Sequence, residues 1–285
     1  MRIAVIAHRA SATNRGLARA AWGRGQASLL TPVEADQLLR PGDAALARLD
    51  VLETLDGIEP GLLELECLAT RGIRLLNDAR SLVIAHDKLL TAYALVAAGL
   101  PHPATEAVSR SSGGVSIEPP LVLKPRFGSW GRDVVLCATP RAVEIALATF
   151  AERRWFETGA VVQELVQPRG HDLRLVVAAG RVVGAIRRIA AHGEWRTNVA
   201  LGASRIAAVP PESAVRLALD AACATGLALC GVDLLPLANG EWTVLEVNGA
   251  VEFTRDYRLL GDPFALAAES LHGLVTNDHR FVTTS

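Results

Sequence analysis

Three oxygen-bearing side chains stand close together in the last fifth of the sequence. In the strand-like run V-L-E-V-N, alternate residues face the same side, so Glu246 and Asn248 should project together. Asp233 lies in a second apolar run, and pairing of the two strands would bring the three side chains together. Two carboxylates and an amide suit Mg²⁺, which leaves its other positions to water and substrate phosphates; a solvated polar strand face is the alternative. On the metal-site interpretation Leu245 and Val247 pack inward, and losing either carboxylate costs the metal-free protein little stability because like charges no longer repel.

Lysine is scarce, since only Lys88 and Lys124 among the 29 basic residues are lysines. A general preference for arginine explains most of this skew, but a compact ammonium suits a phosphate oxygen where a wide guanidinium does not fit. Lys124 ends an apolar strand and opens into the loop Arg126–Arg132. Glycines in this loop let backbone N–H groups approach anionic oxygens, Ser129 adds a hydroxyl, and Trp130 adds an apolar cover. We expect a mobile phosphate-binding flap here, with a plain hairpin as the alternative.

Two further stretches carry polar groups at strand spacing. Residues 161–166 are expected to form an interdomain strand whose backbone edge reads adenine. The run G-H-D-L-R sets an acid and a base, Asp172 and Arg174, on one strand face, and Arg188 and the loop Trp195–Asn198 supply further cations nearby. Each signal is weak alone, because charged strand faces are usually just solvated.

The secondary-structure elements that position these residues are expected to follow an α/β pattern in the first part of the chain and an α+β pattern in the rest. Strands and helices alternate over the first 80 residues, which predicts a small open α/β sheet. A single helix is expected over 81–99, and an α+β body follows it. The expected strands are 3–7, 27–30, 50–52, 73–76, 121–123, 134–137, 161–165, 173–178, 182–188, 231–236 and 242–248. The other expected helices are a stretch with Leu17, Ala20 and Ala21 on one face, after a Ser/Thr/Asn turn, and the spans 62–70, 141–152, 212–227 and 263–274.

Composition excludes several classes of protein. The 285 residues are half apolar and carry 29 basic against 30 acidic side chains, which argues against a polybasic nucleic-acid footprint. No run approaches the ~18 apolar residues of a membrane-spanning helix, and the four cysteines lack metal-ligand spacing, so we expect reduced thiols in a cytoplasmic protein. Signatures of a P-loop, a dinucleotide-binding fold and a serine nucleophile elbow are absent from the sequence.

Taken in order, the motifs resemble those of a known family. Between Asn77 and Phe253 the chain reads N-D-x₅-I-x₃-D-K, L-K-P-x-x-G-S-W-G-R, Q-E-L-V, G-x-D-x-R, R-x-N, V-D-L-L and L-E-V-N. This set resembles ATP-grasp carboxylate–amine ligases of the ribosomal-protein glutamate-ligase type. The motif G-S-W-G-R and the pair Glu252–Phe253 look most like the branch that ligates amino acids to a carrier protein in lysine biosynthesis.

The resemblance implies an ATP-grasp fold with an N-terminal α/β domain (1–79), a central lid subdomain (80–160) and a C-terminal subdomain with the metal site (161–285). It also implies ATP and Mg²⁺ as cofactors, with Mn²⁺ as an alternative, and amide formation through an acyl phosphate. Arg174 and Arg188 would steady the acyl phosphate and the oxyanion. The implied ATP-binding residues are Lys88, Lys124, Ser129, Trp130, Gln163, Glu164, Leu165, Val166, Asp172, Arg196 and Asn198, and the metal ligands are Asp233, Glu246 and Asn248.

The chain departs from the family pattern in its leader. Relatives often carry an arginine after the third strand, where residues 52–55 here read L-E-T-L, and Ala203 replaces a glycine of the carrier-ligating branch. Both departures concern acceptor or loop geometry rather than the nucleotide site, so the acceptor stays open among a carrier-protein tail, a ribosomal protein and a small pterin- or furan-type cofactor. The resemblance implies glutamate as the amino acid. Nucleic acid and membrane are not expected partners, and a homo-oligomer stays open. Rival functions are a kinase-like phosphotransferase and a non-catalytic ATP-binding regulator.

Overall fold

The computed structural model describes residues 1–23, 25–112 and 114–276. Its N-terminal part contains a four-stranded parallel sheet in the order β2-β1-β3-β4. The helices are set by local caps: Ser11 caps α1 and Thr31 forms a capping box with Glu34 at the start of α2. The elements are β1 (Ile3–Ile6), α1 (Ala12–Arg19), β2 (Ser28–Leu30), α2 (Pro32–Leu38), β3 (Ala44–Ala47), α3 (Leu62–Thr70) and β4 (Arg74–Leu76).

The third strand is β3, so the prediction of a strand at 50–52 was wrong. The sequence A-A-L-A of β3 has low strand propensity and no alternation, because the strand is buried on both faces of a parallel sheet. Helix α2 was likewise not expected. The shift matters for the leader, because the residue that directly follows β3 is Arg48.

The expected single helix over 81–99 is two helices, α4 (Ala79–His86) and α5 (Lys88–Ala97). Asp87 ends the first and caps the second: its backbone is extended (φ −89°, ψ 104°), and its side chain accepts hydrogen bonds from the N–H groups of Leu89 and Leu90. The break places Lys88 at the first turn of α5.

The middle sheet is antiparallel in the order β5-β8-β6-β7, and α6 covers it. Phe150, Trp155 and Phe156 pack edge to face in its small core. The elements are β5 (Thr105–Val108), which was not expected, β6 (Leu121–Pro125), β7 (Val135–Cys137), α6 (Pro140–Ala151), a 3₁₀ turn (Arg154–Thr158) and β8 (Ala160–Glu164).

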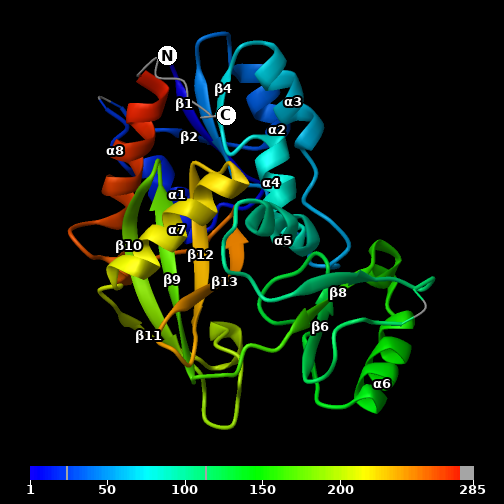
Figure 1. The fold of residues 1–285 in the computed structure, drawn as a ribbon. Helices are drawn as coiled ribbons and strands as arrows, with labels where there is room; N and C mark the ends of the chain where they lie inside the picture. The colour runs from blue at the N-terminus through cyan, green and yellow to red at the C-terminus, as the bar shows by residue number, and fades with distance from the viewer. Residues whose placement is uncertain (24, 113, 277–285) are drawn as a thin grey trace.

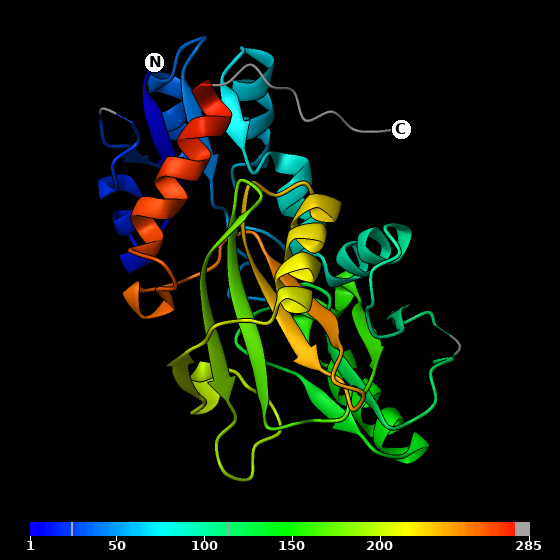
Figure 2. The ribbon, with the colours of Figure 1, turned by 60° about the vertical axis from the view of Figure 1, so that its left-hand side comes forward.

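The large sheet is antiparallel in the order β11-β10-β9-β12-β13. Helix α7 covers one face, while α8 covers part of the other face and also packs on α1 (Figures 1 and 2). The elements are β9 (His171–Ala178), β10 (Arg181–Ile189), a 3₁₀ turn (Val199–Leu201), β11 (Ser204–Ala207), α7 (Glu212–Thr225), β12 (Leu229–Pro236), β13 (Trp242–Asn248), a 3₁₀ turn (Arg255–Tyr257) and α8 (Pro263–Thr276).

Two apolar cores join the N-terminal sheet to the large sheet. One core contains Ile6 of β1 and Ala45 and Ala47 of β3 together with Leu175 of β9. The other core contains Val5 of β1 together with Val176 of β9. Helices α4 and α5 pack against α7 and β13, and α5 also packs against β5 of the middle sheet, while β8 extends this sheet to Glu164. The strands of the middle sheet lie within Thr105–Glu164, and the predicted domain bounds 1–79, 80–160 and 161–285 stay predictions. No helix within the described residues is long and apolar enough to cross a membrane.

Candidate active site

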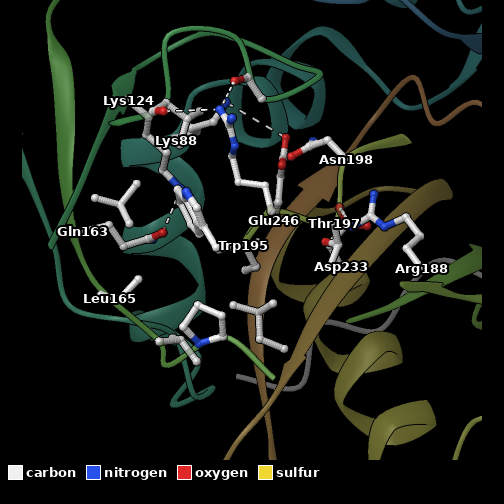
Figure 3. A pocket seen from close by; sticks show the side chains of 18 of the residues that line it. Lys88, Lys124, Gln163, Leu165, Arg188, Trp195, Thr197, Asn198, Asp233 and Glu246 are labelled. Atoms are coloured by element: carbon white, nitrogen blue, oxygen red, sulfur yellow. Dashed lines mark hydrogen bonds and ion pairs between the residues drawn. The ribbon is translucent and has the colours of Figure 1, made fainter. Parts of the chain in front are cut away.

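A cavity lies between the middle sheet and the large sheet, bounded by β6, the loop after it, the end of β8, the loop 195–198 and strands β12 and β13 (Figure 3). Most of the predicted residues line it. They are Lys88, Lys124, Ser129, Trp130, Gln163, Glu164, Leu165, Val166, Arg188, Arg196, Asn198, Asp233 and Glu246. Arg174 and Asn248 instead line an adjoining cavity, which Ser129, Trp130, Arg188, Asn198 and Glu246 also line.

The two lysines face this first cavity. The Nζ of Lys88 donates to the carbonyl oxygen of Gly128 at 2.5 Å and lies 4.0 Å from a carboxylate oxygen of Glu246 (Figure 3). Lys124 is buried, and its Nζ donates to the Oε1 of Gln163 at 2.7 Å. Burial, reinforced by the charge of Lys88, lowers the pKa of Lys124 to about 7. The site thus holds a desolvated amine with a neutral partner, which an anionic oxygen would stabilise in its charged form.

Asp87 anchors the flap that follows Lys124. Both of its carboxylate oxygens accept hydrogen bonds from the guanidinium of Arg126, at 2.6–2.8 Å. The backbone N–H of Lys88 donates to the carbonyl oxygen of Arg126 at 3.1 Å. The break between α4 and α5 therefore fixes one end of the flap to the helix that presents Lys88.

The far side of the flap contacts the loop 194–198. Arg196 donates to the carbonyl oxygen of Gly131 at 3.1 Å and is held in turn by Glu194, at 2.9 Å. The hydrogen bonds from Arg196 lower the pKa of Glu194 to about 2. Gly131 has a φ of +71°, and a Cβ there would lie 2.8 Å from the Oδ1 of Asn198. A glycine is therefore required for this close approach.

Four charged side chains form a buried chain of alternating sign across the large sheet. Arg188 pairs with Asp172 through both carboxylate oxygens and donates to Asp233 at 2.8 Å. Arg174 donates to both oxygens of Asp233 at 2.6 Å. Figure 3 shows Arg188 beside Asp233. Arg188 lies directly opposite Asp172 in the register of β10 and β9, and Asp233 lies directly opposite Arg174 in the register of β12 and β9. The hydroxyl of Thr197 also donates to Asp172.

The two aspartates of this chain differ in their ionisation. Burial would raise the pKa of Asp233, but Arg174 and Arg188 outweigh burial and hold this pKa below its usual value. Burial raises the pKa of Asp172 in spite of Arg188. Asp172 is fully buried and does not itself line the cavity, and its predicted place at the nucleotide stays a prediction. It orients Arg188.

The strands that carry the three predicted metal ligands pair as the sequence predicted in some respects and differ in others. Asp233 lies directly opposite Glu246 in the register of β12 and β13, as the sequence predicted. The register shifts just beyond this pair, which leaves Leu245 in a bulge facing the first cavity; its predicted inward packing was wrong, whereas Val247 is buried. The Nδ2 of Asn248 is buried without a hydrogen-bond partner among the described residues. The oxygen atoms of these three side chains are of the kind that Mg²⁺ prefers. Asp233 would hold the ion while also accepting hydrogen bonds from Arg174 and Arg188.

Sequence reasoning missed Arg48, which is 2 % exposed. Its guanidinium donates to Asn14 at 2.6 Å and to the carbonyl oxygen of Val251 at 2.7 Å, and its Nη1 has no partner among the described residues. Val251 and Glu252, which lies 3.6 Å from Arg48, line the adjoining cavity. The expectation that this chain lacks an arginine after its third strand was therefore wrong, because the strand itself had been placed too late.

Comparison with known proteins places this geometry in a family. Residues 85–265 match the family described as the RimK-like ATP-grasp domain. The chain belongs to this family. The predicted ATP-grasp fold is confirmed by solved structures: the RimK domain protein from Sphaerobacter thermophilus (TM-score 0.67, 23 % identity, covering 97 % of this chain and 100 % of that chain) and the ATP complex of D-alanine–D-alanine ligase from Bacillus anthracis (0.67, 18 %, 96 % and 94 %).

Two curated relatives of this ATP-grasp chain carry glutamate-ligase names. The probable alpha-L-glutamate ligase of Parasynechococcus marenigrum is 34 % identical over 221 residues, which cover 70 % of this chain and 46 % of the relative. The tetrahydromethanopterin:alpha-L-glutamate ligase of Methanosarcina acetivorans is 30 % identical over 229 residues, covering 72 % of this chain and 68 % of the relative. The chain thus spans less than half the length of the first relative and about two thirds of the second.

Proposed function

We propose that this ATP-grasp chain is an ATP- and Mg²⁺-dependent ligase that joins the amine of an amino acid to a substrate carboxylate. The observation that carries the proposal is the pair of lysine ammonium groups opposite the acidic pair Asp233–Glu246 in one cavity. Cations suit the phosphates of ATP, and carboxylates suit the metal that bridges them. Family membership and the names of both relatives support the same chemistry.

The proposed reaction has two steps. An oxygen of the substrate carboxylate attacks the γ-phosphorus of ATP, ADP leaves, and an acyl phosphate forms. The amine nitrogen then attacks the acyl carbon, the carbon–oxygen bond to phosphate breaks, and the nitrogen loses a proton as the amide forms. Bound Mg²⁺ supplies charge neutralisation at the phosphate oxygens. Such chemistry requires positioning and compensation of charge rather than a nucleophilic side chain.

Within this scheme the chain's own residues divide the work. Lys88 and Lys124 hold phosphate oxygens, the residues from the end of β8 onward, Glu164 to Val166, flank adenine, and Glu246 with Asp233 and Asn248 holds the metal. Arg174 and Arg188 present guanidinium groups at the border of the two cavities. We assign to them the stabilisation of charge on the acyl phosphate and the oxyanion. Arg196 and Ser129 line the first cavity on the side of the flap.

The adjoining cavity is our candidate site for the amino acid and the carboxylate acceptor. Two buried donors without partners among the described residues belong to it or lie beside it, the Nδ2 of Asn248 and the Nη1 of Arg48, and Arg205 also lines it. Donors of this kind suit the carboxylates of a dicarboxylic amino acid. Glutamate is accordingly the proposed amino acid; a carrier protein, a ribosomal protein or a small pterin- or furan-type cofactor is the proposed acceptor. The predicted cytoplasmic location and a homo-oligomeric state remain predictions.

The test is ADP release by the purified protein across an amino-acid panel, with and without each acceptor, followed by mass spectrometry of the products. We expect ADP release that depends on both substrates and a product heavier by one glutamyl residue. Phosphorylation of a hydroxyl would instead identify a phosphotransferase, and ATP binding without turnover would identify a regulator. Glu246→Gln should abolish turnover, whereas the exposed Glu241→Gln is the matched control.

A further inference from the structure

The one hydrogen bond that the described residues give the Lys124 ammonium leads to a network no motif predicted. Its acceptor, Gln163, projects from β8 toward Lys124 on the neighbouring β6 (Figure 3). The Nε2 of Gln163 donates to the Oγ1 of Thr105 at 2.8 Å and to the Nε2 of His102 at 3.2 Å. Both amide hydrogens are thus used, and the carbonyl oxygen is turned toward the lysine.

His102 continues the chain into the large sheet. Its Nδ1 lies 2.8 Å from the carbonyl oxygen of Val244, which accepts from it, so the Nε2 carries a lone pair that accepts from Gln163. This arrangement requires a neutral imidazole, and burial lowers the pKa of His102 to about 4. The preceding residue, Pro101, is fixed to the same strand, because its carbonyl oxygen accepts from the Val244 N–H at 2.9 Å and from the Thr243 hydroxyl at 3.0 Å.

We propose that His102 is a positioning residue for Lys124: it ties the lysine's acceptor, Gln163, to β13, the strand that carries Glu246. Lys124 belongs to the middle sheet and Glu246 to the large sheet, so the spacing between a phosphate-binding ammonium and a metal-binding carboxylate depends on a link between the two sheets. The chain Lys124–Gln163–His102–Val244 is such a link. Along it each side chain donates a hydrogen bond to the next residue, so all the bonds point the same way.

A second consequence concerns Gln163 itself. Its amide is committed to Lys124, Thr105 and His102, and its backbone is paired with β5 on one side and β6 on the other. Gln163 therefore acts on the nucleotide through the lysine, and the reading of adenine falls to the residues that follow it. The inference rests on the proposed function, because it assigns a role in binding ATP.

The two ends of the imidazole can be tested separately. His102→Asn keeps a donor at the δ position for Val244 but removes the acceptor for Gln163, whereas His102→Gln keeps an acceptor at the ε position and removes the donor. His8→Asn is the matched control, because His8 is an exposed histidine that also bonds a backbone carbonyl, that of Pro60. Thr105→Val removes the other acceptor of Gln163.

Binding of Mg²⁺ and a non-hydrolysable ATP analogue is measured by calorimetry, and KM and kcat are measured for ATP and for glutamate. His102→Asn should raise the Kd and the KM for the nucleotide roughly three- to tenfold, the range of one neutral hydrogen bond, with the KM for glutamate unchanged. His102→Gln should show a similar loss, because it breaks the bond to Val244 at the other end of the link; Thr105→Val should show a smaller loss, and His8→Asn should match the wild type.

Wild-type nucleotide affinity in His102→Asn would overturn the inference while leaving the proposed function intact. Equal rises in the KM for ATP and glutamate would also overturn it, since they indicate a general structural role. If the wild type does not bind the nucleotide, the proposed function fails and the inference with it. Should thermal unfolding show that His102→Asn does not fold, Gln163→Met decides: unchanged nucleotide affinity there refutes the network.

Discussion

The cations on the two sides of the cavity are treated differently by their surroundings. On one side, Lys124 of the middle sheet is buried against a neutral amide, and Lys88 of α5 bonds a backbone carbonyl, with the carboxylate of Glu246 at 4.0 Å. On the large-sheet side, Arg174 and Arg188 are already neutralised by Asp233 and Asp172. A side chain whose charge is compensated mainly shapes the site, whereas one left without an anion is available for a ligand. On the proposed function, we therefore expect the lysines to bind the phosphates of ATP, while the arginines, besides the role proposed for them at the acyl phosphate, hold the carboxylate of Asp233 in place.

Breaking the compensated side should have the largest effect on stability. Asp233→Asn leaves Arg174 and Arg188 buried with one carboxylate between them, so we expect a loss of about 3–5 kcal/mol in the free energy of unfolding. This reverses the expectation from sequence that losing the carboxylate would relieve repulsion. Urea denaturation measures the loss, with the exposed Asp220→Asn as control. A change below about 1 kcal/mol would show that the arginines do not depend on Asp233.

Replacing the lysine on the other side should damage ligand binding rather than folding. Lys124→Arg keeps a cation, but a fully buried position packed against Gln163 has no room for the guanidinium fork. We expect ATP affinity to fall about 10- to 100-fold, nearly as far as in Lys124→Ala, the range for a charged hydrogen bond. Lys88→Arg, at a position with more exposure, should be milder. Full rescue by arginine at position 124 would attribute the scarcity of lysine to codon preference alone.

The pH dependence of nucleotide binding sharpens the same contrast. In the free protein the pKa of Lys124 is about 7, and contact with phosphate raises it. Above pH 7 the lysine must therefore take up a proton on binding, so affinity should fall as pH rises, by at most tenfold per pH unit. Calorimetry in buffers of different ionisation enthalpy between pH 7.5 and 9.5 measures this uptake. Lys124→Ala should abolish it; uptake that persists in that variant would place the titrating group elsewhere.

The smallest effect is expected in the flap, residues 126–133. It is fixed at one end by Asp87 and touched by Arg196 near the other, yet Trp130 remains 46 % exposed. An ATP analogue with Mg²⁺ should slow hydrogen exchange in this segment several-fold. Trp130→Gly should raise ATP hydrolysis relative to amide formation, because water reaches the acyl phosphate. Equal exchange with and without the nucleotide would identify a static hairpin.

Sequence patterns sufficed where local chemistry decides the structure. Helix α3 and strand β13 have the predicted bounds, because a helical run closed by Gly72 and an alternating strand are both readable from neighbours alone. The motif residues around the lysines do meet in one cavity.

Prediction failed where the local structure is decided by residues distant in the sequence or by a single helix-capping side chain. The alanine-rich β3 is a strand because other elements bury it, and Asp87 divides a helix by offering its carboxylate to two N–H groups. The pairing of Asp233 with two arginines and the position of Arg48 depend on contacts between residues 34 to 203 apart in the sequence. No spacing rule along the chain reports such contacts.

The ties between the leader and the loop after β13 have a consequence for protein engineering. Thr13 exchanges two hydrogen bonds with the backbone of Phe253, and Arg48 binds the carbonyl oxygen of Val251. The segment 85–265 that matches the family excludes the leader and most of α8, which together cover Phe253 and the strand residue Val176. An excised fragment would expose this apolar surface. A chimera with altered acceptor choice therefore has to transplant the leader, the loop 249–253 and α8 as one cassette.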